Sequence, residues 1–261
     1  MIRIHDKQLG DLGVALGLEQ FEDDMVAHLY GFSPRHSEVI GDDWLRRTIR
    51  LGIERAAVYG VTNPGLLRFY VELMVMYGSA FDVDPLQPWA GKVLRDPRIP
   101  DEVTRIDLLY EAYRGYREVV SDPDGRAPIQ ALRNLAQILG EGTPLAELRT
   151  EQRALEKLVQ SYPQRCAYLG EPQLLQLIHR APEEAARNDM AMDAGVVLAT
   201  GMMFAIGPAF GADPLYPWIM ATLRDPAIKS AERRAERLEK RIRIYVTRAV
   251  EYLERKRTHV R

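Results

Sequence analysis

The chain has few of the residues and patterns that mark secreted, membrane-bound or catalytic proteins. It contains one cysteine, Cys166, so it can form no intramolecular disulfide, which suits a reducing compartment. Its first residues include no apolar run of the kind found in secretory signal peptides. We therefore expect a cytoplasmic protein. The chain has 261 residues, 46% of them hydrophobic, which is enough to form a sizeable core.

Motifs for catalysis, phosphate binding and metal binding are also missing. The sequence has no HExxH, no GxSxG, no phosphate-binding glycine loop and no CxxC. Asp24 and His28 lie four residues apart and could face one metal ion, but no second pair with ligand spacing follows. An ordinary pair on a helix surface is the preferred interpretation. We expect no cofactor, no metal and no catalytic residue.

One long uncharged run, residues 194–212, could suggest a membrane span because it covers 19 residues. It is rich in glycine and alanine, contains Pro208, and is bracketed by Asp193 and Asp213 rather than by Lys or Arg. We therefore predict a buried helix that ends near Gly207 and Pro208.

One segment of the sequence occurs twice. Residues 78–99 read GSAFDVDPLQPWAGKVLRDPRI, and residues 207–228 read GPAFGADPLYPWIMATLRDPAI. The offset of 129 residues needs no gap and continues on both sides, with about two dozen identities over about 88 aligned positions. This period is far longer than the roughly 20–50 residues of solenoid repeats. The sequence therefore predicts a duplicated domain.

Each copy of the repeated segment contains an Asp-Pro pair followed by leucine, at Asp84-Pro85 and at Asp213-Pro214. Aspartate is a favoured N-cap, and proline is favoured at the first position of a helix. The pattern predicts a short helix after each pair. These helices are expected near 85–95 and 214–224.

The predicted short helices carry Trp89 and Trp218, where a large aromatic side chain can fix each helix to the core. A structural motif is therefore the preferred interpretation. The alternative is a binding site formed by Asp82 and Asp84, although the second copy has Gly211 in place of Asp82.

Helical periodicity runs through the rest of the chain, and no segment reads as a strand. The predicted helical regions are 6–30 with a break before Glu19, 42–59, 64–80, 101–120, 128–139, 144–161, 171–188, 189–207 and 230–257. We predict an all-α protein of two tandem, duplicated helical-bundle halves. The predicted boundaries are 1–122 for the first repeat, 123–129 for a linker and 130–261 for the second repeat.

Charge is spread unevenly, although the net charge is only −2. Residues 1–129 carry 15 basic and 21 acidic residues, whereas residues 130–261 carry 20 and 16. The difference in charge between the two halves could come from unselected substitutions on solvent-exposed surfaces after the duplication. The alternative is that the first half presents an acidic face to a basic partner. We predict that several acids of such a face are exposed, at helix starts and in the loop before Pro85. The candidate residues are Glu22, Asp23, Asp24, Asp42, Asp43, Asp82 and Asp84.

The segment 60–96 ends in FDVDPLQPW, which has the form FDxDPxxPW. It resembles uncharacterised proteobacterial proteins with motifs of the form FGxDFDTDPxxPWA, which are often encoded beside type VI secretion effectors and other polymorphic toxins. The second copy departs from this pattern at Gly211 and Ala212, which weakens a functional role for the acidic pair itself. The resemblance supplies no catalytic residues.

The resemblance implies a small protein that binds another protein, encoded by a neighbouring gene. The first expectation is an immunity protein that neutralises a type VI antibacterial toxin. The second is an adaptor or chaperone that holds an effector for loading, and a helical enzyme is a weaker alternative. Interspersed glutamates in 230–257 favour a solvated helix over a nucleic-acid site. We expect neither nucleic acid nor membrane as a partner, and the oligomeric state stays open.

Overall fold

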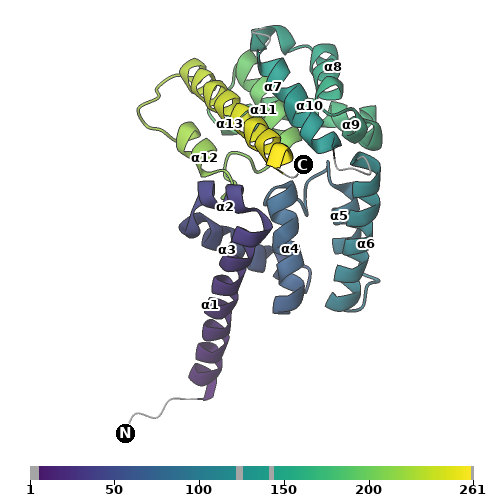
Figure 1. The fold of residues 1–261 in the computed structure, drawn as a ribbon, viewed down its shortest axis with the longest axis vertical. Helices are drawn as coiled ribbons and strands as arrows, with labels where there is room; N and C mark the ends of the chain where they lie inside the picture. The colour runs from purple at the N-terminus through teal and green to yellow at the C-terminus, as the bar shows by residue number, and fades with distance from the viewer. Residues whose placement is uncertain (1–5, 122–125, 141–143, 260–261) are drawn as a thin grey trace.

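The computed structural model describes residues 6–121, 126–140 and 144–259, which form helices and connecting loops (Figure 1). These residues hold thirteen α-helices and one 3-10 helix, and no strand occurs in this part of the chain. The prediction of an all-α protein is therefore confirmed. Among the same residues, no helix is both long and apolar enough to span a membrane.

The first six helices form an N-terminal group. Their bounds are α1 Asp6–Phe32, α2 Pro34–Ile40, α3 Asp42–Ala57, α4 Pro64–Tyr77, α5 Pro88–Leu94 and α6 Glu102–Val120. They enclose a cluster of buried side chains, the N-terminal core. Its fully covered members include Leu29, Leu45, Ile49, Tyr70, Leu73, Met74 and Phe81.

The remaining helices form a C-terminal group. Their bounds are α7 Ala127–Gly140, η1 Leu145–Leu148, α8 Glu151–Ser161, α9 Pro163–Leu169, α10 Glu171–Arg187, α11 Asp193–Ile206, α12 Pro217–Leu223 and α13 Ala231–His259. A second cluster, the C-terminal core, lies inside them. It includes Leu174, Ala181, Met203, Phe210, Ile219 and Leu238.

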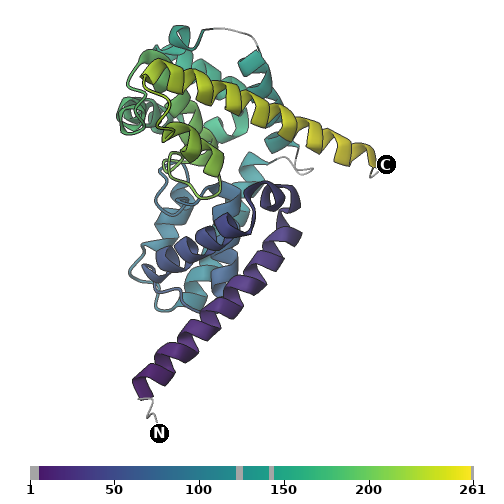
Figure 2. The same cartoon turned by 90° about the vertical axis from the view of Figure 1, so that its left-hand side faces the viewer.

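The two groups are stacked along the long axis of the molecule (Figure 1). Helix α1 extends from the N-terminal group to one end of the molecule, and α13 crosses the C-terminal group and projects sideways from it (Figure 2). The junction between the groups is formed by the loops around α5 and α12, together with α2 and α9.

Proline and glycine set many helix ends. Proline opens α2, α4, α5, α9 and α12, where its missing N–H is no loss. Gly78 and Gly207 follow α4 and α11 with φ of 95° and 98°, a conformation that favours glycine. A Cβ at Gly78 would lie 2.1 Å from the Ile206 carbonyl oxygen. Glycine therefore also lets the ends of α4 and α11 approach each other.

The uncharged run 194–212 contains most of α11, which ends at Ile206 just before Gly207 and Pro208. Leu198, Ala199 and Met203 on this helix are buried. The prediction of a buried helix that ends at this point is confirmed.

The predicted break before Glu19 is wrong, because α1 runs without interruption from Asp6 to Phe32. Each glycine in this helix lowers its stability by only about 1 kcal/mol relative to alanine, which does not break a helix by itself. Helix α7 begins at Ala127 and therefore includes the last three residues of the predicted linker 123–129. Residues 122–125 lie outside the described part of the chain.

Candidate functional site

The repeated segments join the two cores by exchanging leucines. Leu86, from the first segment, is 1% exposed and packs in the C-terminal core. Leu215, from the second segment, is 1% exposed and packs in the N-terminal core. Tyr168 and Tyr216 contact both cores. Each segment therefore inserts an apolar side chain into the core of the other group.

Two buried aspartates accompany the exchanged leucines. Asp213 Oδ2 accepts a hydrogen bond from the Ser79 backbone N–H, and its Oδ1 accepts one from Leu215 N–H, both at 2.9 Å. Asp84 Oδ1 accepts from Leu86 N–H at 2.9 Å. Asp84 Oδ2 has no hydrogen-bond partner among the described residues.

The difference between the two aspartates has a chemical cause. The residue 129 positions after Ser79 is Pro208, and proline has no backbone N–H to donate. Burial raises the pKa of Asp84 to about 6, although the Leu86 N–H and two arginine charges lower it. Burial also raises the pKa of Asp213, against the two N–H groups that bind it.

The raised pKa of Asp84 makes stability depend on pH. The folded state prefers the protonated carboxyl, so its contribution is full below the ordinary value of 3.8 and is lost as the pH rises through about 6. We expect Asp84→Asn to raise the free energy of unfolding by about 1–3 kcal/mol at pH 8 and to change it little at pH 4. Urea unfolding at both pH values measures the difference.

Asp213→Asn is the matched control for this prediction. An amide NH2 in place of one carboxylate oxygen would face the N–H of Ser79 or Leu215, so this variant should be less stable than the native chain at pH 8. If Asp84→Asn also lost stability at pH 8, Asp84 would have a donor that the structure does not contain.

All four repeated Asp-Pro pairs form the same turn. In each, the N–H two residues further on donates to the aspartate carboxylate at 2.9 Å, an Asx-turn. The donor and acceptor pairs are Leu86 and Asp84, Arg98 and Asp96, Leu215 and Asp213, and Ala227 and Asp225. Helices α5 and α12 therefore begin at Pro88 and Pro217, not at the predicted Pro85 and Pro214.

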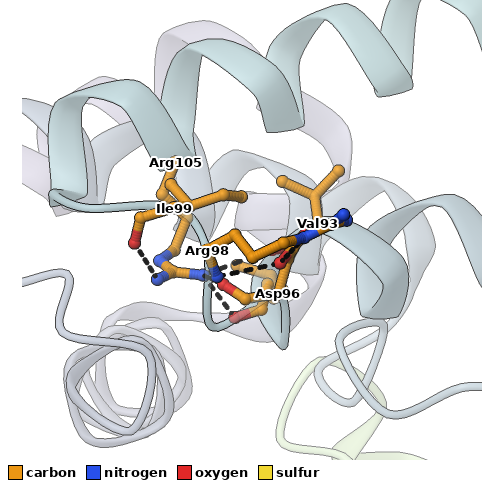
Figure 3. Close-up of polar contacts among 6 residues, drawn as sticks. Val93, Asp96, Arg98, Ile99 and Arg105 are labelled. Carbon is orange, nitrogen blue, oxygen red and sulfur yellow. Dashed lines mark hydrogen bonds and ion pairs between the residues drawn. The ribbon is translucent and has the colours of Figure 1, made fainter.

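An arginine holds the end of α5 (Figure 3). Arg105 donates four hydrogen bonds of 2.8–3.2 Å to the backbone carbonyls of Val93, Leu94, Asp96 and Ile99. Its counterpart 129 residues later, Arg234, donates to the Ile228 carbonyl at 2.8 Å. Carbonyls at a helix end lack partners within the helix. The repeated Leu-Arg-Asp-Pro segments therefore have a structural role.

The two repeated tryptophans have similar surroundings. Trp89 stacks on Tyr116 with ring centroids 5.6 Å apart, and Trp218 stacks on Tyr245 at 5.4 Å. Each pair connects a short helix to the long helix that follows it. The Asp-Pro prolines differ, because Pro85 is exposed and Pro214 is buried.

Asp82, which the sequence placed on an acidic face, lies inside the protein. It is 2% exposed and accepts hydrogen bonds from Arg55 at 2.5 and 3.0 Å and from Tyr59 Oη at 2.9 Å. In the second copy, 129 residues later, Glu184 stands in place of Arg55 and Gly211 in place of Asp82, so neither partner of the ion pair is kept. Asp82 is therefore one half of a buried ion pair.

Glu22 and Asp84 are also buried. The predicted exposure of the two acids in the loop before Pro85, Asp82 and Asp84, is therefore wrong. Glu22 is 7% exposed and accepts two hydrogen bonds from Arg50, at 2.7 and 2.9 Å. Asp84 is covered because its loop enters the junction of the two groups. These acids contribute to internal packing rather than to a surface.

Four of the predicted acids are exposed: Asp23, Asp24, Asp42 and Asp43. Asp23 pairs with Arg46 at 2.5 Å, and Tyr30 Oη donates to Asp42 at 2.7 Å. The Asp23 hydrogen bond and the Asp42 charge both raise the pKa of Arg46, so Asp23 and Asp42 lie near one arginine. We call the four the α1–α3 acidic edge.

No group of three or more His, Cys, Asp or Glu residues that could hold a metal occurs within the described ranges. His28 Nε2 contacts Glu72 Oε1 at 2.6 Å, while Asp24 accepts from Gln20. Burial raises the pKa of Cys166 to about 11, so its thiol stays protonated at neutral pH.

A comparison of the chain with protein-family models, curated proteins and solved structures finds no match. Sequence patterns also did not single out Arg55, which is one of many arginines in the helical segments. The sequence did contain one sign that the two buried aspartates would differ. Pro208 replaces Ser79 inside an otherwise similar segment, which removes a backbone donor.

Proposed function

We propose that the two groups of helices arose by duplication of one helical unit. Helix α11 begins and ends 129 residues after α4, and the same offset relates α9 to α2 and α12 to α5. This is the offset of the sequence repeat. The exchanged leucines and the stacked tryptophans are also related by it, which supports two equivalent units at 1–122 and 130–261.

We propose that the chain is a non-catalytic protein that binds a basic protein partner. The observation that carries this proposal is the α1–α3 acidic edge, which stays exposed while Glu22, Asp82 and Asp84 are used inside the protein. Asp24 and Asp43 form no ion pair among the described residues. They are therefore the carboxylates that a positively charged partner could neutralise.

The proposed partner is an antibacterial toxin of a type VI secretion system, which the chain neutralises in the cytoplasm as an immunity protein. The resemblance of the FDxDPxxPW segment to proteins encoded beside such toxins supports this choice. Complementary charges raise association rates and disfavour wrong partners. An acidic edge suits an inhibitor that must meet its toxin quickly.

A pair of charge reversals tests the acidic edge. The proposed partner is the product of the neighbouring gene, which is co-purified with the chain. The association of the two proteins is then followed by stopped flow at low salt. We expect Asp24→Lys with Asp43→Lys to slow association at least tenfold and to weaken its salt dependence. Helical circular dichroism should stay unchanged.

The control carries the same change of charge elsewhere, as Asp107→Lys with Glu236→Lys at exposed positions of α6 and α13. It should associate within about twofold of the native rate. Equal association rates for the two variants would show that the α1–α3 acidic edge is not the surface that binds the partner. Binding without protection of cells, together with loss of effector secretion on gene deletion, would replace immunity by the adaptor role.

A further inference from the structure

One histidine lies where the two groups of helices meet. His36 is on α2 of the N-terminal group, and its ring contacts two tyrosines of the C-terminal group. The ring centroids of His36 and Tyr216, the residue before α12, are 5.4 Å apart. Tyr245 Oη, from α13, lies 3.5 Å from His36 Nδ1. His36 therefore belongs to the contact between the two groups rather than to the interior of either one.

The neutral imidazole fits this place better than the charged form. His36 Nε2 is shielded from solvent and has no hydrogen-bond partner among the described residues. Burial lowers the pKa of His36 from 6.5 to about 4. Burial also raises the pKa of the Tyr216 and Tyr245 hydroxyls, so both tyrosines are neutral at pH 7 and below. A protonated ring would therefore carry a charge that neither water nor a neighbouring anion stabilises.

The charged groups of the surrounding elements are bound to other partners. Beside His36 on α2, Arg35 and Glu38 are exposed and pair with each other at 3.2 Å. Three further groups on the neighbouring elements are Asp42 of α3, bound to Tyr30 of α1, Asp213 of the loop before α12, bound to Ser79 and Leu215, and Arg241 of α13, bound to Trp218 and Thr222. Burial alone accounts for the lowered pKa of His36, so none of these charges compensates a proton on the ring.

The equivalent place on the other side of the junction holds a permanent cation. The residue 129 positions after His36 is Arg165 of α9, which is 8% exposed. Its Nη1 donates to the Phe204 carbonyl at 2.5 Å, and its guanidinium lies 4.8 Å from the centroid of the Phe204 ring. The residue 129 positions before Phe204 is Val75, which has no aromatic ring to receive a cation. The α9 side of the junction therefore accommodates a positive charge, whereas the α2 side is built for a neutral group.

We propose that His36 is a pH-sensitive switch that opens the α2 side of the junction in acid. A charged ring needs water around it, and water reaches the ring when Tyr216 and Tyr245 separate from α2. Tyr216 follows Leu215 in the chain, so this movement also draws Leu215 out of the N-terminal core. The helices inside each group stay intact. This proposal is independent of the acidic edge and of the protein partner.

Proton binding sets the direction and the size of the effect. A histidine in contact with water binds its proton near pH 6.5, whereas His36 in the closed junction binds it only near pH 4. The closed form is therefore most stable above pH 7 and loses stability as the pH falls from about 6.5 toward 4. Between pH 8 and pH 5, His36 alone should shift the equilibrium about 30-fold toward the open form.

Amide hydrogen exchange at pH 8 and pH 5, corrected for the intrinsic rate at each pH, tests the proposal. The Ser79 N–H is the reporter, because it donates across the junction to Asp213. In the native chain, acid should lower its protection about 30-fold more than in His36→Phe, which keeps an aromatic ring beside Tyr216 but cannot be charged. Comparing the two chains cancels the titration of Asp213 itself, which occurs in both.

Two further variants and a second set of amides complete the test. His36→Gln is neutral and polar and should behave like His36→Phe, while His179→Gln, at an exposed position of α10, should match the native chain within about threefold. Amides in the middle of α4 should keep their protection at pH 5. The same pH dependence in the native chain and in His36→Phe would overturn the proposal. An equal loss of protection at Ser79 and in α4 would also overturn it, because acid would then unfold the whole protein rather than open the junction.

Discussion

Replacing Leu86 by alanine is expected to lower the free energy of unfolding by about 2–5 kcal/mol, and Leu215→Ala by a similar amount. Both side chains are 1% exposed, and each fills space in the core of the other group. Alanine would leave a cavity at the junction in either case. The loss should therefore be as large as for a leucine in the middle of a single core, although both residues lie in loops.

Urea unfolding, followed by circular dichroism and by tryptophan fluorescence, measures this effect. Leu108→Ala on α6 serves as the control, since Leu108 is 45% exposed and its loss should change stability by less than about 0.5 kcal/mol. If either junction variant behaved like Leu108→Ala, the exchanged leucines would not hold the two groups together.

Arg55→Met is expected to lower the free energy of unfolding by about 3–5 kcal/mol. It leaves the carboxylate of Asp82, whose side chain is 3% exposed, with the Tyr59 hydroxyl as its remaining side-chain hydrogen-bond donor. Breaking a buried ion pair lowers stability far more than breaking a surface pair, because water cannot solvate the buried charge that remains.

Two comparisons separate the loss of the ion pair from the loss of packing. Arg68→Met breaks an exposed pair with Glu72 and should change stability by about 0–1 kcal/mol. Adding Asp82→Asn to Arg55→Met should recover part of the loss, because the buried charge is then removed. Equal effects of Arg55→Met and Arg68→Met in urea unfolding would show that Asp82 is solvated.

Much of the fold follows from the sequence alone, because helical periodicity is a local property. The uncharged run before Gly207 could be assigned to a buried helix from its composition and from its terminal Gly-Pro. The start of α5 could not. Asp84-Pro85 satisfies the local rules for a helix start and also those for an Asx-turn, and in the structure it forms the turn.

The candidate site was harder to predict, because the exposure of an acid depends on what packs over it. Asp82 and Asp24 look alike in the sequence, yet Arg55 and Tyr59 enclose the first and solvent surrounds the second. The unpaired state of Asp84 depends on Pro208, which lies more than one hundred residues away and comes into register only through the fold.

A growth assay tests the proposed function most directly. Cells express the product of the neighbouring gene together with the native chain, the variant Asp24→Lys with Asp43→Lys, or the control Asp107→Lys with Glu236→Lys. We expect the native chain and the control to restore growth, and the acidic-edge variant to restore it poorly at equal expression. Failure of the native chain to protect, or equal protection by all three chains, would contradict the proposal that the chain neutralises a basic toxin through α1 and α3.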